Sequence, residues 1–334
     1  MSEYTFEQET REMLRYAVQK HMLGDLKYAH YLYNKVLIRD RSNTRCRLYF
    51  AQLLISQDRH QDALKVLAGE QKHPQWRYLK GEAHKRLGQA EEADAYFQQA
   101  LALKSDYLEI HSHYASERFK NFGYQWFIEE VHKILQPEHY LEIGVAGGDT
   151  LILAAGAKSA IGVDPKPTPV HTFGDNTRVF AMESDAFFAG EHGQGLEPLD
   201  LAFIDGLHEA TQVVRDFLNV LPNMAKGAVV MFHDVLPISE FTATKERNSL
   251  FWTGDVWKGY GALTRAFDLE HFTVPVGPSG LGFMVAKDPG RELAPDLYET
   301  LIADLDSRGL DQYNQERREL PVPEALEALK ALKP

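Results

Sequence analysis

The chain has a single cysteine among its 334 residues, Cys46, and this scarcity excludes an intrachain disulfide. It has no apolar run near the ~18 residues that a membrane-spanning helix needs. The first ten residues, MSEYTFEQET, are polar and acidic and lack the basic and apolar segments of a signal peptide. The sequence therefore predicts a cytoplasmic protein without membrane association, in which Cys46 is a plain thiol outside any Cys/His cluster.

Positive charge is scarce in the second part of the chain. Residues 1–120 hold 19 Lys and Arg against 16 Asp and Glu, a net charge of +3. Residues 121–334 hold 17 against 32, a net charge of −15, and the two parts together give −12. A surface that binds nucleic acid needs basic residues to replace the counterions of the phosphates. The acidic second part therefore argues against DNA or RNA as a substrate.

A pattern of small and turn-forming residues recurs three times in the first third of the chain. Small residues at two positions let paired helices approach closely, a Gly or Asp marks the turn within each pair, and a large apolar residue fills the space between units. Successive copies are 34 and then 30 residues apart. The copies are Ala17, Gly24, Ala29 and Tyr33; Ala51, Asp58, Ala63 and Leu67; and Gly81, Gly88, Ala93 and Phe97.

The third copy, residues 81–101, resembles the tetratricopeptide repeat. We therefore expect an all-α repeat domain over residues 1–105. Stacked repeats leave a concave surface, which is expected either to bind a protein partner or to pack against the rest of the chain or a second copy of it. Residues 106–120 are interpreted as a linker, in which His111 and His113 alternate as in an extended segment and are either solvated or able to chelate a metal.

Expected strands and helices alternate from residue 121 onward. A helix is expected at 121–135, parallel strands at 140–145, 159–164, 178–182, 199–205 and 227–234, and a closing antiparallel pair at 271–276 and 281–286. This pattern predicts an α/β domain over residues 121–290, with a doubly wound, mainly parallel, seven-stranded sheet covered by helices on both faces. A helical extension over 291–334 follows, with an apolar stripe suited to docking at Leu326, Leu329 and Leu332.

The first strand ends in a glycine-rich motif, residues 142–150 (EIGVAGGDT). The glycines Gly144, Gly147 and Gly148 allow a tight turn and a close approach to a ligand, and ligands of parallel sheets bind at the carboxyl ends of strands. Asp164 ends the second strand, where a carboxylate can accept both hydroxyls of a ribose. Because the motif lacks the G-x-G-x-x-G spacing of a dinucleotide site, it favours S-adenosylmethionine, which carries no phosphate.

Three more residues are expected at the cofactor. Glu142 and Thr150 stand near the ends of the glycine-rich motif. Asp185 follows the third strand and is expected either to bind the adenine amino group or to cap a helix.

Acids and histidines follow the fourth and fifth strands. The fourth strand ends at Asp205, with His208 three residues later, and the fifth ends at His233 and Asp234. Because neighbouring parallel strands end at the same edge, we expect the four side chains to converge. Such a group suits either a hard divalent ion such as Mg²⁺ or removal of a hydroxyl proton by a histidine.

Four segments, YLEIGVAGGDT, FIDGLHEATQVVRDF, GAVVMFHDV and GDVWKGY, together resemble class I methyltransferases of the macrocin-type sugar O-methyltransferase group over residues 120–288. The resemblance implies S-adenosylmethionine-dependent methylation of a hydroxyl on a small molecule or glycan. It also implies that positions 205, 233 and 234 hold Mg²⁺ in metal-dependent members. Here His233 replaces an acid and Leu207 replaces the acid proposed as the base. His208 therefore becomes the candidate base, with Asp205 and His233 completing the catalytic set and Asp205 also near the cofactor.

Other interpretations remain open at this stage. The fold is either an active enzyme or a catalytically silent scaffold whose repeat domain binds a partner, and a protein substrate delivered by the repeats is a further possibility. Three aromatic residues near a polar stretch, Trp252, Trp257 and Tyr260, are expected either to form a lid or sugar-stacking wall or to anchor a loop.

Overall fold

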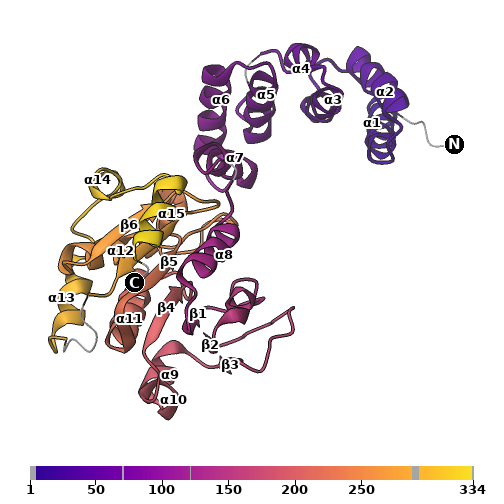
Figure 1. Ribbon diagram of the computed structural model, residues 1–334. Coiled ribbons are helices and arrows are strands. Elements are labelled where there is room, and N and C mark those ends of the chain that lie inside the picture. Colours follow the sequence, from indigo (N-terminus) through magenta and orange to yellow (C-terminus); the bar gives the residue numbers. More distant parts are fainter. Residues whose placement is uncertain (1–4, 70, 121, 288–292, 333–334) are drawn as a thin grey trace. The chain divides into compact units, whose positions relative to one another are not determined.

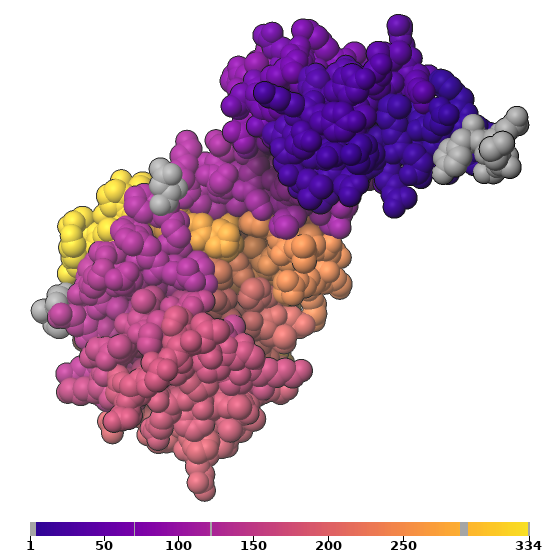
Figure 2. Space-filling view, turned by 90° about the vertical axis from the view of Figure 1, so that its right-hand side faces the viewer, coloured from indigo at the N-terminus to yellow at the C-terminus, as the bar shows by residue number. Residues whose placement is uncertain are grey.

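The structure is a computed structural model that describes residues 5–69, 71–120, 122–287 and 293–332. The chain divides into two compact units, Met1–Ile110 and His111–Pro334. Figure 2 shows the first unit in indigo and purple and the second in magenta to yellow. No helix in the described ranges has the length and apolar character needed to cross a membrane.

The N-terminal unit is all-helical, and its successive helices form pairs (Figure 1). The pairs are α1 (Phe6–Met22) with α2 (Leu26–Arg39), α3 (Thr44–Ser56) with α4 (His60–Val66), and α5 (Pro74–Arg86) with α6 (Ala90–Leu103).

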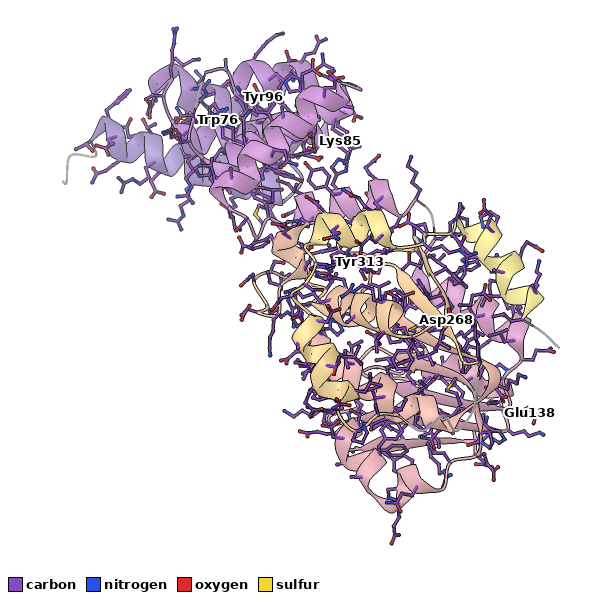
Figure 3. All side chains as sticks on the ribbon, turned by 90° about the vertical axis from the view of Figure 1, so that its left-hand side faces the viewer. Trp76, Lys85, Tyr96, Glu138, Asp268 and Tyr313 are labelled. Atoms are coloured by element: carbon purple, nitrogen blue, oxygen red, sulfur yellow. The ribbon has the colours of Figure 1, made fainter. Side chains whose placement is uncertain are left out.

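The repeated residues have the roles that their pattern predicts. The turn positions Gly24, Asp58 and Gly88 all have a left-handed backbone, with φ of +80°, +58° and +76°. A Cβ atom at Gly81 would lie 2.6 Å from the ring of Phe97, so the two helices of this pair approach too closely for a side chain. The other small and large apolar positions of the pattern are buried. Trp76 of α5 is also fully buried and lies inside this unit (Figure 3).

The expected linker is helical rather than extended. Residues Leu108–Arg118 form α7. In the second unit, His111 is buried and its ring stacks on Phe241 and Phe251, at centroid distances of 5.8 and 6.4 Å. The alternation of His111 and His113 was therefore misread as an extended pattern, and aromatic packing explains why His111 is placed inside.

The second unit is built on a seven-stranded sheet in the order β3-β2-β1-β4-β5-β7-β6. The strands β1 to β5 are parallel, and β7 pairs antiparallel with both β5 and β6. This confirms the predicted fold class. The strand bounds are β1 (His139–Ile143), β2 (Ser159–Asp164), β3 (Thr177–Ala181), β4 (Leu199–Ile204), β5 (Met224–His233), β6 (Glu270–Val274) and β7 (Leu281–Val285).

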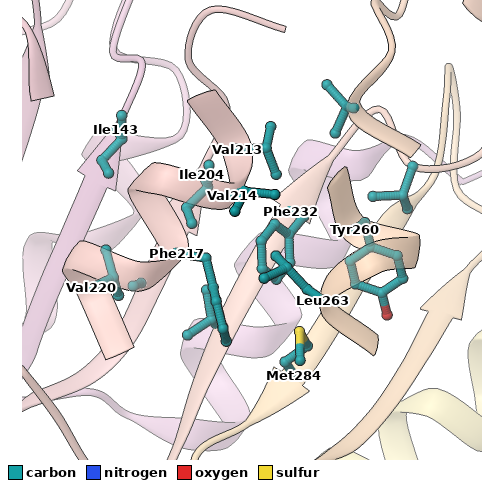
Figure 4. Close-up of a cluster of buried hydrophobic side chains, with 14 of the residues drawn as sticks. Ile143, Ile204, Val213, Val214, Phe217, Val220, Phe232, Tyr260, Leu263 and Met284 are labelled. Atoms are coloured by element: carbon teal, nitrogen blue, oxygen red, sulfur yellow. The ribbon is translucent and has the colours of Figure 1, made fainter. Parts of the chain in front are cut away.

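Helices cover both faces of the sheet because its strands are apolar on both sides. On β4, Ile204 faces one buried cluster and Phe203 faces the other. The first cluster lies under α11 (Ala210–Val220) and α12 (Val256–Ala266), and Figure 4 shows Phe217 of α11 and Tyr260 of α12 in it. The second lies under α8 (Tyr124–Leu135) and α15 (Val322–Ala331).

The C-terminal extension packs as part of this unit. Helices α13 (Leu297–Asp304) and α14 (Leu310–Glu316) contribute to the first cluster, and α15 contributes to the second. Leu329 is fully buried, while Leu326 and Leu332 are partly buried against the same cluster. The apolar stripe is thus a docking face. The remaining short helices are η1 (Leu151–Gly156), α9 (Ser184–Ala189), α10 (Glu191–Gln194), η2 (Leu221–Asn223) and η3 (Glu240–Ala243).

Candidate active site

A cavity of about 660 Å³ opens at the carboxyl ends of β1, β2 and β4. The order of strands reverses between β1 and β4, and such a switch point is where open α/β sheets bind ligands. Most of the residues singled out from the sequence line this cavity. They are Gly144, Gly147, Thr150, Asp164, Asp185, Asp205, His208 and His233.

The glycine-rich loop needs its glycines for two different reasons. Gly144 has a φ of +92°, and a Cβ atom there would lie 1.9 Å from the carbonyl oxygen of Asp205. Gly148 has a φ of +80°, and its Cβ atom would lie 2.6 Å from the ring of Phe173. The loop therefore turns in a left-handed conformation and is pressed between the end of β4 and a later segment. Gly148 supports the loop and lies outside the lining of the cavity.

Asp164 shapes the loop as well as the cavity. Its Oδ2 accepts hydrogen bonds from the backbone N–H groups of Val145 and Ala146, at 3.0 and 2.9 Å. Its Oδ1 accepts one from the N–H of Lys166 at 2.7 Å. Each carboxylate oxygen has two acceptor positions, so Oδ1 keeps one for a ligand in the cavity that Asp164 lines.

Glu142 does not line the cavity, in contrast to the expected cofactor contact. It is fully buried and accepts hydrogen bonds from the hydroxyls of Tyr140 at 2.7 Å and Thr150 at 2.9 Å. Burial raises the pKa of Glu142 to about 8, although both hydrogen bonds act in the opposite direction. Its geometry is that of a residue that holds Thr150, which itself reaches the cavity.

Asp185 does not cap a helix. It lies in the first turn of α9 after the N-cap residue Glu183, and no side-chain cap bond forms there. Its carboxylate pairs with Arg215 at 2.7 Å and accepts a hydrogen bond from Gln212 at 3.1 Å. It therefore stands as a fixed carboxylate on the wall of the cavity.

The structure brings Asp205, His208, His233 and Asp234 together. Oδ1 of Asp205 lies 3.3 Å from Nε2 of His208 and 3.1 Å from Nδ1 of His233. Nδ1 of His208 lies 3.0 Å from Oδ2 of Asp234, but the contact does not have hydrogen-bond geometry. Among the residues that the structure describes, this buried nitrogen has no hydrogen-bond partner.

Strained backbone holds two members of this group. His208 and Asp234 have φ values of +60° and +59°, which residues other than glycine rarely adopt. A Cβ atom at Gly254 would lie 1.9 Å from the carbonyl oxygen of His208, so the loop before α12 presses directly on that strained residue. Strain of this kind persists where the surrounding structure enforces it, and it gathers at functional sites.

Ser279, from the loop between β6 and β7, fixes the inner side of the group. Its buried hydroxyl donates a short hydrogen bond to Oδ1 of Asp234, and its oxygen lies 3.5 Å from Nε2 of His233. Since the hydroxyl has one proton, its oxygen can only accept from that nitrogen. With Nδ1 directed at Asp205, the geometry suits a His233 that carries a proton on both nitrogens.

The charges of the group explain its pKa values. Burial lowers the pKa of His233, but the carboxylates of Asp205 and Asp234 outweigh it and raise the pKa to about 9. For Asp205, burial is opposed and exceeded by the two histidines, so its pKa is lowered. Burial dominates for Asp234 and raises its pKa. The pKa of His208 is raised because the hydrogen bond to Asp205 and the charge of Asp234 exceed the effect of burial.

Three of these residues can offer ligand atoms to one metal ion. Single donor atoms of Asp205, His208 and Asp234 all lie within 4.8 Å of one another. This set has His208 where the sequence led us to expect His233. The donor set of two carboxylates and one imidazole, together with the unpartnered Nδ1 of His208, fits a divalent cation. His233 instead directs Nδ1 at Asp205 and packs its ring on Tyr124, at a centroid distance of 4.2 Å.

The aromatic residues near the polar stretch divide into two roles. Trp257 and Tyr260 are buried in the core and anchor α12. Trp252 is half-buried and stacks on the imidazole of His208, at a centroid distance of 5.4 Å and an interplanar angle of 21°. Trp252 does not line the cavity, so it supports His208 from behind.

Several site residues were missed from the sequence. Tyr124, Asp149 and Gln212 line the cavity, and so does the buried Asp216, whose pKa burial raises to about 6. Asp149 stands inside the glycine-rich motif and its position was the available signal. No signal in the sequence pointed to Ser279, because it lies in the loop between β6 and β7, far along the chain from Asp234.

Comparison with known proteins agrees with this geometry. Residues 141–235, from β1 to the end of β5, match a family model described as a methyltransferase domain. The chain therefore contains a methyltransferase-type domain on a sheet typical of class I methyltransferases. No curated protein matches the sequence significantly.

The solved structures that resemble the chain do so distantly. The O-methyltransferase TomG of Streptomyces achromogenes, in complex with S-adenosylmethionine, aligns with 54% of this chain and 89% of its own, at 15% identity and a TM-score of 0.41. An O-methyltransferase of Bacillus cereus aligns over 55% and 91%, at 18% identity and a TM-score of 0.39. MamA of Desulfovibrio magneticus aligns over 32% of this chain at 22% identity and a TM-score of 0.30, and the chain spans only 62% of the MamA chain.

Proposed function

We propose that the protein is an S-adenosylmethionine-dependent O-methyltransferase that acts on a hydroxyl of a small molecule or of a sugar in a glycan. The observation that carries this proposal is one cavity in which the glycine-rich loop, Asp164 and the Asp205–His208 pair all meet. The match of residues 141–235 to a methyltransferase domain supports it independently.

The acids of the cavity suit this cofactor. Asp164 and Asp185 both line the cavity. In this proposal Asp164 accepts hydrogen bonds from the ribose hydroxyls, and Asp185 accepts one from the adenine amino group. S-adenosylmethionine carries a positive sulfonium, which the surrounding carboxylates favour by simple Coulomb attraction. A dinucleotide would bring phosphates into the same acidic surroundings.

The transfer itself is a displacement at carbon. Bound S-adenosylmethionine would supply the methyl group: the acceptor oxygen would gain it as the carbon–sulfur bond breaks, with S-adenosylhomocysteine as the product. Alignment of the two reactants supplies much of the rate. His208 takes the hydroxyl proton, and the carboxylates of Asp205 and Asp234 balance the charge that it gains. His233 keeps Asp205 in place through the hydrogen bond between them.

A metal-assisted route uses the same residues differently. A divalent cation such as Mg²⁺ held by Asp205, His208 and Asp234 would lower the pKa of the acceptor hydroxyl. The two roles of His208 exclude each other, since a nitrogen that ligates a metal cannot also take a proton. Activity that survives a chelator would assign His208 as the base, whereas activity restored by Mg²⁺ would assign it as a ligand.

Calorimetry with S-adenosylmethionine, with and without Mg²⁺, tests the cofactor assignment. We expect the wild type to bind and Asp164→Ala to bind at least tenfold more weakly, because the loop amides and the ribose lose their acceptor. Asp175→Ala, which removes an exposed acid after the same strand, is the control and should bind like the wild type. Absence of binding by the wild type would favour a scaffold with a silent methyltransferase fold.

Loss of His208 should separate chemistry from binding. We expect His208→Ala to abolish methylation of an acceptor found in a panel of sugars and phenols, while the affinity for S-adenosylmethionine changes little. Retained turnover would remove His208 from its role.

The N-terminal repeats are proposed to hold a protein partner, which includes a second copy of the chain or a protein substrate. Stacked helix pairs are suited to such contacts. Methylation only of proteins, with none of the small hydroxyl compounds accepted, would favour docking of a protein substrate by the repeats.

A further inference from the structure

A segment after β2, residues 165–173, crosses the glycine-rich loop, and we call it the strap. The N–H of Thr168 donates to the carbonyl of Ala146 at 2.8 Å, and the N–H of Val170 donates to that of Gly147 at 3.0 Å. The ring of Phe173 fills the space where Gly148 has no side chain. The strap is thus bound to the loop by backbone hydrogen bonds and by packing.

The strap places His171 against Asp149. Nε2 of His171 lies 2.6 Å from Oδ1 of Asp149, which is a strong, charge-assisted distance. Within the described ranges of the chain, Oδ2 of Asp149 accepts no hydrogen bond, and it lies 3.6 Å from the position of a Cβ atom at Gly147. Asp149 lines the cavity. One oxygen is therefore held, and the other is available to a ligand.

Asp164 and Asp149 are associated with opposite ends of the glycine-rich loop. Asp164 binds the amides of Val145 and Ala146, at the start of the loop. Asp149 follows the last glycine of the loop and lines the same cavity as Tyr124, whose ring stacks on His233. The cavity that both acids line therefore extends from the start of the loop at Asp164 to its end at Asp149.

The amino-acid part of the proposed cofactor requires an acceptor. The methionine part of S-adenosylmethionine ends in an α-carbon that bears a carboxylate and an ammonium group. The ammonium group donates three hydrogen bonds and bears a full positive charge. Glu142 is unable to serve, because it is fully buried and accepts from Tyr140 and Thr150. Asp149 has both the charge and a free oxygen.

We propose that Asp149, oriented by His171 of the strap, binds the α-ammonium group of the methionine part of the cofactor. This inference rests on the proposed function. The inference extends the proposed function, because it divides the cavity into a nucleoside end at Asp164 and an amino-acid end at Asp149. It also assigns a role to the strap, which orients Asp149 through His171.

Calorimetry with two uncharged-sulfur probes tests this division. S-adenosylhomocysteine has the amino-acid part, and 5′-methylthioadenosine lacks it. We expect Asp149→Asn in the full-length protein to weaken S-adenosylhomocysteine binding about tenfold, because a charge-assisted hydrogen bond is lost. Binding of 5′-methylthioadenosine, measured by displacement of S-adenosylhomocysteine where it is weak, should stay within about twofold of the wild-type value. His171→Gln should weaken S-adenosylhomocysteine binding by a smaller factor and should likewise leave 5′-methylthioadenosine binding nearly unchanged.

Two further variants serve as references. Asp175→Asn removes the same charge from an exposed position just beyond the strap and should leave both affinities unchanged. Asp185→Asn, at the nucleoside end, should weaken both probes alike. A uniform loss for both probes in Asp149→Asn, or no loss for either, would overturn the inference. If the wild type binds neither probe, the proposed function itself fails.

Discussion

Replacement of Glu142 by glutamine should remove a pH dependence of stability that the buried carboxyl imposes. The pKa of Glu142 is raised from 4.5 to about 8 in the folded protein because burial disfavours its charged form. A group whose pKa is raised on folding contributes stability below its unfolded pKa and loses it as the pH rises toward the folded one. The wild type should therefore lose stability between about pH 4.5 and 8.

The magnitude follows from the size of the shift. A pKa difference of about 3.5 at ~1.4 kcal/mol per unit gives an upper limit of about 5 kcal/mol across this window. Relaxation of the site lowers this figure, so we expect Glu142→Gln to be more stable than the wild type by about 2–4 kcal/mol at pH 8. At pH 5 the two should agree within about 1 kcal/mol, because a neutral amide resembles the protonated acid.

Urea unfolding followed by tryptophan fluorescence provides the measurement. Trp126, Trp252 and Trp257 all lie in the second unit, so the signal reports mainly on the unit that contains Glu142. Asp216→Asn is the matched control, since burial raises the pKa of Asp216 to about 6. This substitution should reduce the pH dependence of the free energy of unfolding below about pH 6 and leave that above about pH 6 unchanged. If the free energies of unfolding of Glu142→Gln and the wild type change in parallel between pH 5 and 8, the reasoning is refuted.

Two other substitutions test contacts that the structure makes specific. Gly144→Ala should bind S-adenosylmethionine more than tenfold more weakly and have a lower melting temperature, because the new Cβ atom would meet the carbonyl oxygen of Asp205. Gly195→Ala, at a position with open space around it, should change neither the affinity nor the melting temperature. Wild-type affinity and melting temperature in Gly144→Ala would contradict the close approach. Ser279→Ala should lower the free energy of unfolding by about 1–3 kcal/mol in urea titrations, because Asp234 loses a buried donor. An unchanged midpoint would show that this hydrogen bond is unimportant.

The sequence predicted the sheet and the edge at which the site forms because these depend on local signals. Apolar runs mark the strands, and the carboxyl ends of parallel strands must meet, so Asp164, Asp205 and Asp234 were placed without knowledge of distances. The repeat was visible for a similar reason, since small residues recur wherever helices pack closely. These features depend on residue type and spacing alone.

The remaining details depend on tertiary contacts that spacing does not encode. Glu142 was expected at the cofactor, but the hydroxyls of Tyr140 and Thr150 engage it inside the core. His111 reads as part of an exposed, alternating segment until the aromatic rings that cover it are known. Which of His208 and His233 joins the possible metal ligands depends on side-chain directions, which a sequence does not give.

The position of β7 has a consequence for the order in which the chain can fold. Because β7 lies between β5 and β6, the outer side of β5 stays unpaired until the ribosome has delivered residues 281–285, and β6 has no neighbour in the sheet before then. During synthesis of some fifty residues, the growing chain therefore exposes the unpaired edge of β5, which can pair with other chains. The loop that carries Ser279 is synthesised in the same interval, so a chain that stops before it would leave the carboxylate of Asp234 without the hydrogen bond from Ser279.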